Sequence, residues 1–511
     1  MTSETDIAAK LTPSQLRLAA IILGFSNFIV VLDMTVANVS VPHIAGSLGV
    51  STSQGSWVIT SYSVAEAICV PLTGWLIQRF GAVRLYLFAM AGFGLFSLLC
   101  GISQTLAMIV VARIAQGLCG GLLMPISQTL LMRIFTGADR PKAMLLSAMT
   151  TMLGPAFGPN IGGLINDYMS WHWVFLINLP FVAICLVTVF TLLRAHDGPG
   201  KRVPIDTVGL VLMLIWVASL QYMLDIGREH DWFSDPLVVF LAIASAVGFC
   251  AFIIWELTEE HPIVNIRVFR HGGFTFGVLA LSLCFGAYFA SIVVIPQWLQ
   301  TSMGYPATWA GFITSCTALA ALSTSWLASR AVAKGIDPRL LVSLAVVWIG
   351  LMALARSTWT SEADFWTLTY PQVVQGFGMS FFMLPLTIIS LNAVPPEELA
   401  SATGIQNFVR TIALGISTAL ALTFWSNAQQ EAHSEIAGKL QPDEVMRNMA
   451  NAGMTSDQAL RTIANLADRE AVTMAIDYVF LVTAAVFFLS AAVVWLAPRP
   501  KAHASLAMVA D

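Results

Sequence analysis

The sequence has little charge. Only 11% of its 511 residues are Asp, Glu, Lys or Arg, whereas 57% are hydrophobic. Soluble domains usually carry about 25% charged residues. Apolar runs of the ~20 residues that cross a bilayer recur along nearly the whole chain. The composition therefore predicts a polytopic membrane protein and leaves little chain for a soluble domain.

Several chemical patterns are also missing. The seven cysteines lie inside apolar runs without a CxxC pair, and no His cluster has metal-ligand spacing, so we expect no metal and no cofactor. Neither HExxH nor Gly-x-Ser-x-Gly occurs, which argues against an intramembrane enzyme with catalytic residues. The first apolar run is long and lacks an A-x-A-like cleavage site, so we expect no removed signal peptide. The net charge of -4 gives no support for nucleic-acid binding.

Apolar windows separated by polar or Gly/Pro punctuation predict fourteen transmembrane helices and an all-α fold. Their expected ranges are 17–43, 54–77, 83–103, 107–131, 141–165, 171–193, 206–225, 235–257, 273–300, 307–333, 338–357, 365–391, 399–426 and 473–497. An even number of helices puts both termini on one side. The connections on that side, tails included, hold 17 of the 25 Lys and Arg, so the positive-inside rule makes both termini cytoplasmic.

The two halves of the chain resemble each other. GVSTSQGSWVITS (49–61) is similar to GYPATWAGFITS (304–315), and QGLCGGLLMP (116–125) is similar to QGFGMSFFMLP (375–385). Such echoes in chain order are typical of duplicated transporters. We therefore expect two six-helix bundles that flank an inserted hairpin of two helices. The parts of the chain are an N-terminal tail (1–16), a six-helix bundle (17–193), an inserted hairpin (206–257), a second bundle (273–497) and a cytoplasmic tail (498–511).

Four ionisable residues lie deep in the predicted helices, where a charge costs roughly 2.5 to 3.5 kcal/mol. They are Asp33, Glu66, Arg113 and Arg410. At 1.5 Å per residue, the first three lie at similar depth in the outer half or midplane of one bundle. Asp33 and Arg113 can neutralise each other and separate when the acid takes a proton; the alternative is a static ion pair.

Glu66 has no obvious cationic partner in the sequence. Desolvation favours its neutral form, which suits a proton carrier, although a permanently neutral Glu hydrogen-bonded across helices is equally compatible. Arg410 has either a structural role or a role in binding an anionic substrate. With Arg410, we predict that a substrate cavity includes aromatic and polar residues at suitable depth, namely Asn38, Trp57, Tyr62, Tyr288, Trp298 and Phe381.

The segment GPAFGPNIGG (154–163) combines small residues with two prolines. Glycines spaced four apart form a strip on which another helix can pack closely, and Pro155 and Pro159 remove helix hydrogen bonds. We expect a bending or sealing element of the transport path; simple helix packing is the alternative. Its predicted residues are Gly154, Pro155, Gly158, Pro159, Gly162 and Gly163.

A turn rich in glycine and arginine, GWLIQRFGAVR (74–84), follows the second helix. Gly74 and Gly81 permit a tight connection, while Arg79 and Arg84 can bond helix C-terminal carbonyls or acidic groups. The turn could latch a conformation, or it could be only a positive-inside connection.

These segments in this order resemble the major facilitator superfamily, in particular its fourteen-helix drug:proton antiporters of the EmrB/QacA type, and within them EmrB-type inner-membrane pumps. The likeness is carried by LDMTVANVSVP (32–42), ARIAQG (112–117), GPAFGPNIGG and WHWVFLINLP (171–180). Two departures stand out: Gln78 replaces a frequent Asp, and His172 replaces a common Arg. Glu66 matches no family motif.

The resemblance implies export of hydrophobic, drug-like toxic compounds across the bacterial inner membrane, driven by the proton motive force. It places Asp33 and Arg113 in proton coupling, and Gln116 and Gly117 in conformational gating. It also implies a periplasmic EmrA-like adaptor and a TolC-like outer-membrane channel as partners. A symporter or facilitator for a small polar solute is the alternative function, and a channel would leave the repeat unexplained.

A long connection (427–472) follows the thirteenth predicted helix. PDEVMRNMANAG and TSDQALRTIANLADRE within it predict two short helices, the second begun by Thr455 with Gln458 in capping-box spacing. This loop would suit an adaptor; the alternative is a solvated cap over the second bundle.

Overall fold

The computed structural model describes residues 12–135, 140–194, 206–227, 230–260, 262–395, 398–439 and 455–498. Regular structure in these residues is helical throughout, which confirms the predicted all-α class. The tails 1–11 and 499–511 and the predicted short helix 442–453 lie outside the described residues.

The first bundle consists of helices α1 to α7. Their bounds are α1 Pro13–Leu48, α2 Thr52–Phe80, α3 Ala82–Gly101, α4 Leu106–Ile134, α5 Arg140–Tyr168, α6 Trp173–Leu176 and α7 Asn178–Leu193. The short α6 and α7 together form one membrane span, because only Ile177 separates them and it keeps a right-handed helical conformation.

The inserted hairpin and the second bundle follow. The hairpin comprises α8 Thr207–Ile226, η5 Trp232–Ser234 and α9 Pro236–Thr258, and η6 Ile266–Arg270 leads out of it. The second bundle comprises α10 Gly272–Thr301, α11 Ala307–Ala333, α12 Pro338–Arg356, α13 Phe365–Leu391, α14 Leu399–Lys439 and α16 Ser456–Val494.

Twelve helical spans in the described residues are long and apolar enough to cross a membrane. The helices α2 and α5, with 29 residues each, are also long enough but more polar, and bring the spans in the described residues to fourteen, two of which form the inserted hairpin. Both pack between other helices: α2 against α4 and α14, α5 against α1 and α11. Helices enclosed in this way can hold the small and polar residues that lipid-facing helices avoid.

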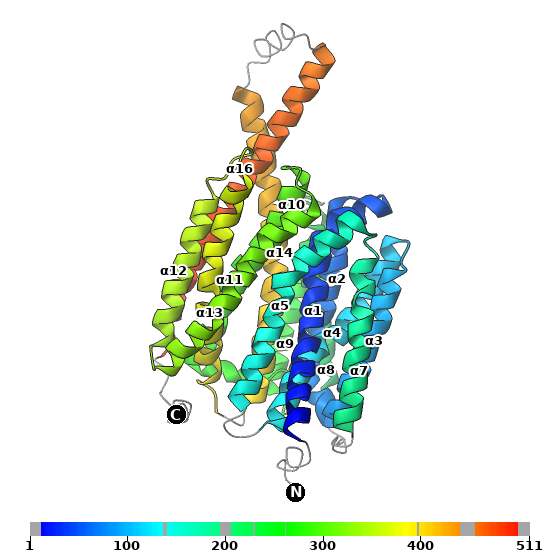
Figure 1. The fold of residues 1–511 in the computed structure, drawn as a ribbon, viewed down its shortest axis with the longest axis vertical. Coiled ribbons are helices and arrows are strands. Elements are labelled where there is room, and N and C mark those ends of the chain that lie inside the picture. Colours follow the sequence, from blue (N-terminus) through cyan, green and yellow to red (C-terminus); the bar gives the residue numbers. More distant parts are fainter. Residues whose placement is uncertain are drawn as a thin grey trace.

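The two bundles lie side by side with their long axes roughly parallel (Figure 1). The helices α14 and α16 project from one end of the bundles as a second, projecting hairpin, and we call this end the hairpin face. The opposite end, where α1 begins and α16 ends, is the terminal face. The inserted hairpin packs through α8 against α2 of the first bundle and α14 of the second. It therefore covers one side of the interface between the bundles.

The projecting hairpin corrects the prediction for the long connection. The helix α14 continues to Lys439 and α16 already begins at Ser456, so the second predicted short helix is the first part of α16 (Figure 1). Thr455 and Gln458 form the predicted capping box. The hydropathy pattern predicted that both helices end at the membrane boundary, because their extensions beyond it are polar. No Gly or Pro interrupts α16 at that boundary, so the helix continues.

Candidate functional site

A buried ion pair joins α1 to α4. Arg113 Nη1 lies 2.5 Å from Asp33 Oδ2, and the two residues are 0% and 1% exposed. The pairing predicted from their depth is therefore present. Since both charges belong to the first bundle, the pair fixes α4 against α1 and does not span the interface between the bundles.

Three further groups complete this pair. Asp33 Oδ1 accepts from Gln116 Nε2 at 3.1 Å and from Asn178 Nδ2 at 2.7 Å, and Arg113 Nε donates to the Val58 carbonyl at 2.9 Å. Gln116, predicted as a gating residue, thus belongs to the ion-pair network. Asn178 was not among the residues predicted from the sequence, although an Asn within the apolar stretch WHWVFLINLP was a usable signal.

Tyr62 lies between the ion pair and the next acid on α2. The Arg113 guanidinium stacks on its ring at 4.1 Å, and Tyr62 is fully buried. Tyr62, predicted to line a substrate cavity, is not among the lining residues of the cavity described next. Glu66 lies one turn further along α2 and lines a different space.

That space is a cavity of about 140 Å³ between the two bundles. Its walls are mostly apolar and combine four methionines with three aromatic rings; Glu66 and Arg410 are the only charged lining residues. The lining consists of Val30, Val31, Met34, Thr35, Glu66, Met124, Phe285, Tyr288, Phe289, Ala318, Ala321, Met379, Met383, Arg410, Thr411 and Leu414.

Glu66 and Arg410 come from opposite bundles. Glu66 Oε2 is shielded from solvent and has no hydrogen-bond partner among the described residues. Arg410, on α14, donates to Met124 Sδ at 3.5 Å and lies 5.2 Å from the Phe285 ring centre. The two side chains share the cavity, and the ion pairs seen among the described residues do not include one between them. The cation that the sequence did not reveal for Glu66 is therefore supplied from the other half of the chain.

Of the residues predicted to line a substrate cavity, Tyr288 and Arg410 line this one. Trp298 instead stacks on Trp359 at 5.7 Å and is fully buried in the second bundle. Asn38 is buried, and Trp57 packs against an apolar cluster beside α8. Phe381 packs against the cluster of the second bundle that includes Phe285 and Tyr288, but it is not among the lining residues. The predicted depth of these residues in the membrane suits a cavity, but depth does not determine which side of a helix faces the cavity.

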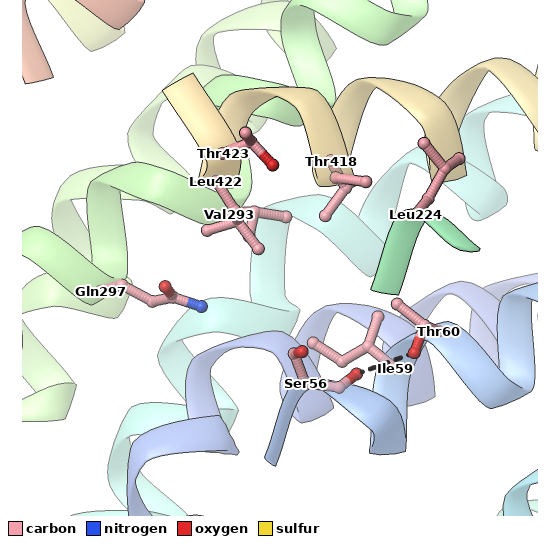
Figure 2. A pocket seen from close by; sticks show the side chains of 10 residues that line it. Ser56, Ile59, Thr60, Leu224, Val293, Gln297, Thr418, Leu422 and Thr423 are labelled. Carbon is pink, nitrogen blue, oxygen red and sulfur yellow. Dashed lines mark hydrogen bonds between the residues drawn. The ribbon is translucent and has the colours of Figure 1, made fainter. Parts of the chain in front are cut away.

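A smaller pocket of about 30 Å³ lies nearer the hairpin face. Figure 2 shows its lining from α2, α8, α10 and α14, with the hydroxyl of Thr60 donating to the Ser56 carbonyl. Ser56, Gln297 and three threonines are its polar residues, and none of its lining residues in the described part of the chain is charged. The cavity with Glu66 and Arg410 is therefore the stronger candidate for coupling a substrate to a charge.

The second bundle contains a buried arginine of its own. Arg356 was not among the residues singled out in the sequence, yet this last residue of α12 is 0% exposed. Its Nη1 donates to Gln372 Oε1 at 3.3 Å, and its guanidinium lies 5.0 Å from the Phe480 ring centre. In the repeat, Gln372 occupies the position of Arg113, so the second bundle does not duplicate the Asp33 site.

The glycine strip of α5 packs against α1, as predicted. A Cβ added at Gly154 would lie 2.8 Å from Val31 Cγ1, and one at Gly162 would lie 3.1 Å from the Val36 carbonyl oxygen. At Gly158 the added carbon would collide with the Thr35 hydroxyl. The side chain of Pro155 is outside what the structure describes, so the predicted bend stays a prediction.

The same segment also reaches the second bundle. A Cβ at Gly163 would lie 2.5 Å from the Ala307 carbonyl oxygen, and one at Gly311 would collide with the Pro159 carbonyl. The segment 154–163 therefore lies between α1 of its own bundle and α11 of the other. Gly117 has a comparable packing role, since a Cβ there would collide with the Tyr62 backbone of α2.

The turn between α2 and α3 is as short as predicted. Gly81 alone separates the two helices and has φ +87°, a conformation that favours glycine. The exposed Arg79 lies over the rings of Trp75 and Phe80, at 5.4 and 5.9 Å from their centres. Gly74 has no neighbouring atom where a Cβ would be added, and Arg84 is exposed.

Comparison with known sequences gives consistent matches. The Major Facilitator Superfamily matches residues 23–418. The multidrug export protein EmrB of Escherichia coli K12 is 39% identical over 494 residues, covering 95% of this chain and 96% of that protein. The fatty acid resistance protein FarB of Neisseria gonorrhoeae is 38% identical over 483 residues, covering 94% and 95%.

Solved structures match the fold at low sequence identity. A crystal structure of the peptide transporter POT with sulfate has a TM-score of 0.66 at 14% identity, covering 97% of this chain and 99% of that one. A bacterial homologue of the human lysosomal transporter Spinster, in an inward-facing and unoccupied conformation, has a TM-score of 0.59 at 14% identity, covering 96% and 100%. These likenesses support the predicted arrangement of two bundles.

Proposed function

This chain belongs to the major facilitator superfamily and is a multi-pass membrane transporter rather than an enzyme, and we propose that it exports hydrophobic toxic compounds in exchange for protons by alternating access. The names of its relatives, multidrug export and fatty acid resistance proteins, support export of apolar compounds.

One observation carries the proposal. A cavity between the bundles holds a carboxylate with an unpaired oxygen, from one bundle, opposite a guanidinium from the other. A protonatable group that shares a chamber with the substrate can link proton binding to substrate release. The four methionines of the wall suit varied apolar compounds, because their flexible side chains fill irregular spaces.

In the proposed cycle, Glu66 is ionised while the cavity is open to the cytoplasm and interacts with Arg410 across the interface. A proton arriving from the opposite side neutralises Glu66 and weakens this attraction, which favours release of the compound and return of the transporter. Asp33 and Arg113 form the second candidate proton site. Their network would have to open before a proton could bind Asp33, since its oxygens already accept three hydrogen bonds.

The driving force is sufficient for this task. One charge crossing a potential of 100 mV supplies ~2.3 kcal/mol, and one pH unit supplies ~1.4 kcal/mol. Since 1.4 kcal/mol is a factor of ten in an equilibrium constant, one proton per compound can sustain a gradient of up to several hundred-fold.

The proposed location is the bacterial inner membrane, with the terminal face in the cytoplasm. The placement of Lys and Arg in the sequence supports this orientation. The projecting hairpin of α14 and α16 would then extend into the periplasm, where it offers a surface for an EmrA-like adaptor connected to a TolC-like channel.

Drug-induced proton release in proteoliposomes tests the proposal. We expect Glu66→Gln to lose proton release and drug accumulation by at least about tenfold, because an amide does not exchange a proton at neutral pH. Glu256→Gln is the matched control: this buried acid of α9 accepts from Val264 N at 3.1 Å and does not line the cavity.

Asp33→Asn separates the two candidate sites in the same assay. Unchanged proton release in Glu66→Gln together with its loss in folded Asp33→Asn would move the proton site to Asp33. Proton-coupled export that survives in both variants would overturn the proposal.

A further inference from the structure

Asp167 of the first bundle is bound to the start of α11 in the second bundle. Its Oδ1 accepts from Ala307 N at 3.2 Å and its Oδ2 from Thr308 N at 2.8 Å, while the Thr308 hydroxyl also donates to Oδ2. A carboxylate that accepts from the first N–H groups of a helix is an N-cap, and its charge also interacts favourably with the positive end of the helix dipole.

The helix α11 has no cap of its own. The residue before its first turn, Pro306, makes no side-chain cap hydrogen bond. In the repeated segment of the first bundle, Ser51 occupies the corresponding position and forms a capping box with Gln54 at the start of α2. The two halves thus differ at one position: α2 is capped from within its bundle, whereas the cap of α11 comes from the other bundle.

Further contacts hold α5 and α11 close together beside Asp167. Asn160 Nδ2 donates to Ser315 Oγ at 2.6 Å, two turns of α11 further into the membrane. Gly163 and Gly311 allow the backbones of α5 and α11 to meet between these two points. The bundles therefore cannot part at the hairpin face unless Asp167 leaves the end of α11.

We propose that Asp167 is a positioning residue that holds the transporter closed at the hairpin face by capping a helix of the opposite bundle. Opening toward that face leaves the first N–H groups of α11 without their partner, and closing restores it. This inference rests on the alternating access of the proposed function, but it requires neither proton coupling nor a particular substrate.

Hydrogen exchange of the full-length protein in detergent, without drug or proton gradient, tests it. In Asp167→Ala we expect the open population to rise about 2- to 30-fold, the range that corresponds to losing an N-cap. Exchange should then increase in α11 (305–312) and also at the distant contact between α2 and α14 (56–60 and 418–423), and decrease at the terminal face (77–82 and 388–394).

Two further variants keep the test sharp. Thr308→Val removes one donor and should shift the same segments less, and adding it to Asp167→Ala should have no further effect, because the hydroxyl contact is already lost. Asp364→Ala is the matched control: Asp364 caps α13 at the same face by accepting from Thr367 N at 3.2 Å, within one bundle. It should raise exchange only at the start of α13.

Increased exchange confined to 305–312 in Asp167→Ala, with the contact between α2 and α14 unchanged, would show a local cap only and overturn the proposal. Exchange identical to that of the unmodified protein would overturn it as well. Loss of proton release in Glu66→Gln is measured separately, so failure of the coupling proposal leaves this result interpretable.

Discussion

The two acids deep in the first bundle differ in their surroundings more than in their depth. Asp33 is enclosed by Arg113, Gln116 and Asn178, and its two oxygens accept three hydrogen bonds. Glu66 has an oxygen without a partner and lines a cavity between the bundles. We therefore expect the enclosed Asp33 to contribute mainly to stability, and Glu66, at the interface, to respond to movement of the other bundle.

The comparison also explains why the charge pair of the family motifs need not be the moving part. Breaking a buried ion pair by removing one partner costs about 3 to 5 kcal/mol. An acid that is held so firmly contributes more to stability than to a reversible switch. The following predictions test this division between the two acids, from the largest expected effect to the smallest.

The largest effect is expected for removal of the Asp33 carboxylate. Asp33→Ala leaves Arg113 buried without its counter-ion and should lower the stability by about 3 to 5 kcal/mol. Thermal unfolding in detergent, followed by size-exclusion chromatography, measures this. Glu66→Ala, with no ion pair to lose, should unfold within a few degrees of the unmodified protein; equal destabilisation of the two variants would remove the distinction.

A smaller loss is expected for Asn178→Ala. This side chain donates to Asp33 Oδ1 and to Ser97 Oγ at 3.0 Å, and both bonds lie in the interior. Hydrogen bonds to charged groups contribute about 1.5 to 3 kcal/mol. The same thermal assay should place Asn178→Ala between Asp33→Ala and the unmodified protein. Stability equal to that of the unmodified protein would contradict the enclosed character of the Asp33 site.

Tyr62 separates the two acids and should show a still smaller effect. Tyr62→Leu removes the ring on which the Arg113 guanidinium stacks at 4.1 Å. A desolvated cation–π contact contributes about 2 kcal/mol, and leucine retains part of the apolar packing. Tyr62→Phe keeps the ring and is the control, since the phenol oxygen has no hydrogen-bond partner among the described residues. If the two variants unfold alike, the stacking does not contribute.

The smallest effect is expected at the surface and depends on pH. The hydroxyl and the backbone N–H of Thr367 donate to Asp364, just outside α13, and lower its pKa. A lowered folded-state pKa gives stability that is present above the usual value of about 3.9 and is lost as the pH falls through the folded value. The melting temperatures of the unmodified protein and Asp364→Asn should therefore differ slightly at pH 6 and converge below about pH 4.

Much of the fold could be predicted from the sequence because the membrane imposes a one-dimensional pattern. Apolar runs indicated every spanning helix, and depth along the helices paired Asp33 with Arg113. Hydropathy did not predict the polar extensions of α14 and α16 beyond the membrane, although the capping box at Thr455 marked the start of α16. The pattern also did not mark Arg356 as buried, because a charge at a helix end looks the same whether it faces water or the bundle interior.

The site was predicted less well, since a periodic pattern gives depth but not the direction in which a side chain points. Tyr62 and Trp298 have the right depth for a cavity and point into their own bundles. Arg410 could not be paired with Glu66, because the two bundles meet only in the folded chain. Asp167 was not singled out for the same reason: the helix that it caps belongs to the other half.

The length of α14 has a mechanical consequence. This single helix carries Arg410 in the cavity and continues to Lys439 beyond the bundles. At 1.5 Å per residue, about 44 Å of continuous helix separates the two positions. A helix of that length acts as a lever, so a tilt of only about 5° at the cavity displaces its far end by about 4 Å. A movement of α14 at the cavity during the transport cycle would thus also move the projecting hairpin and any protein bound to it.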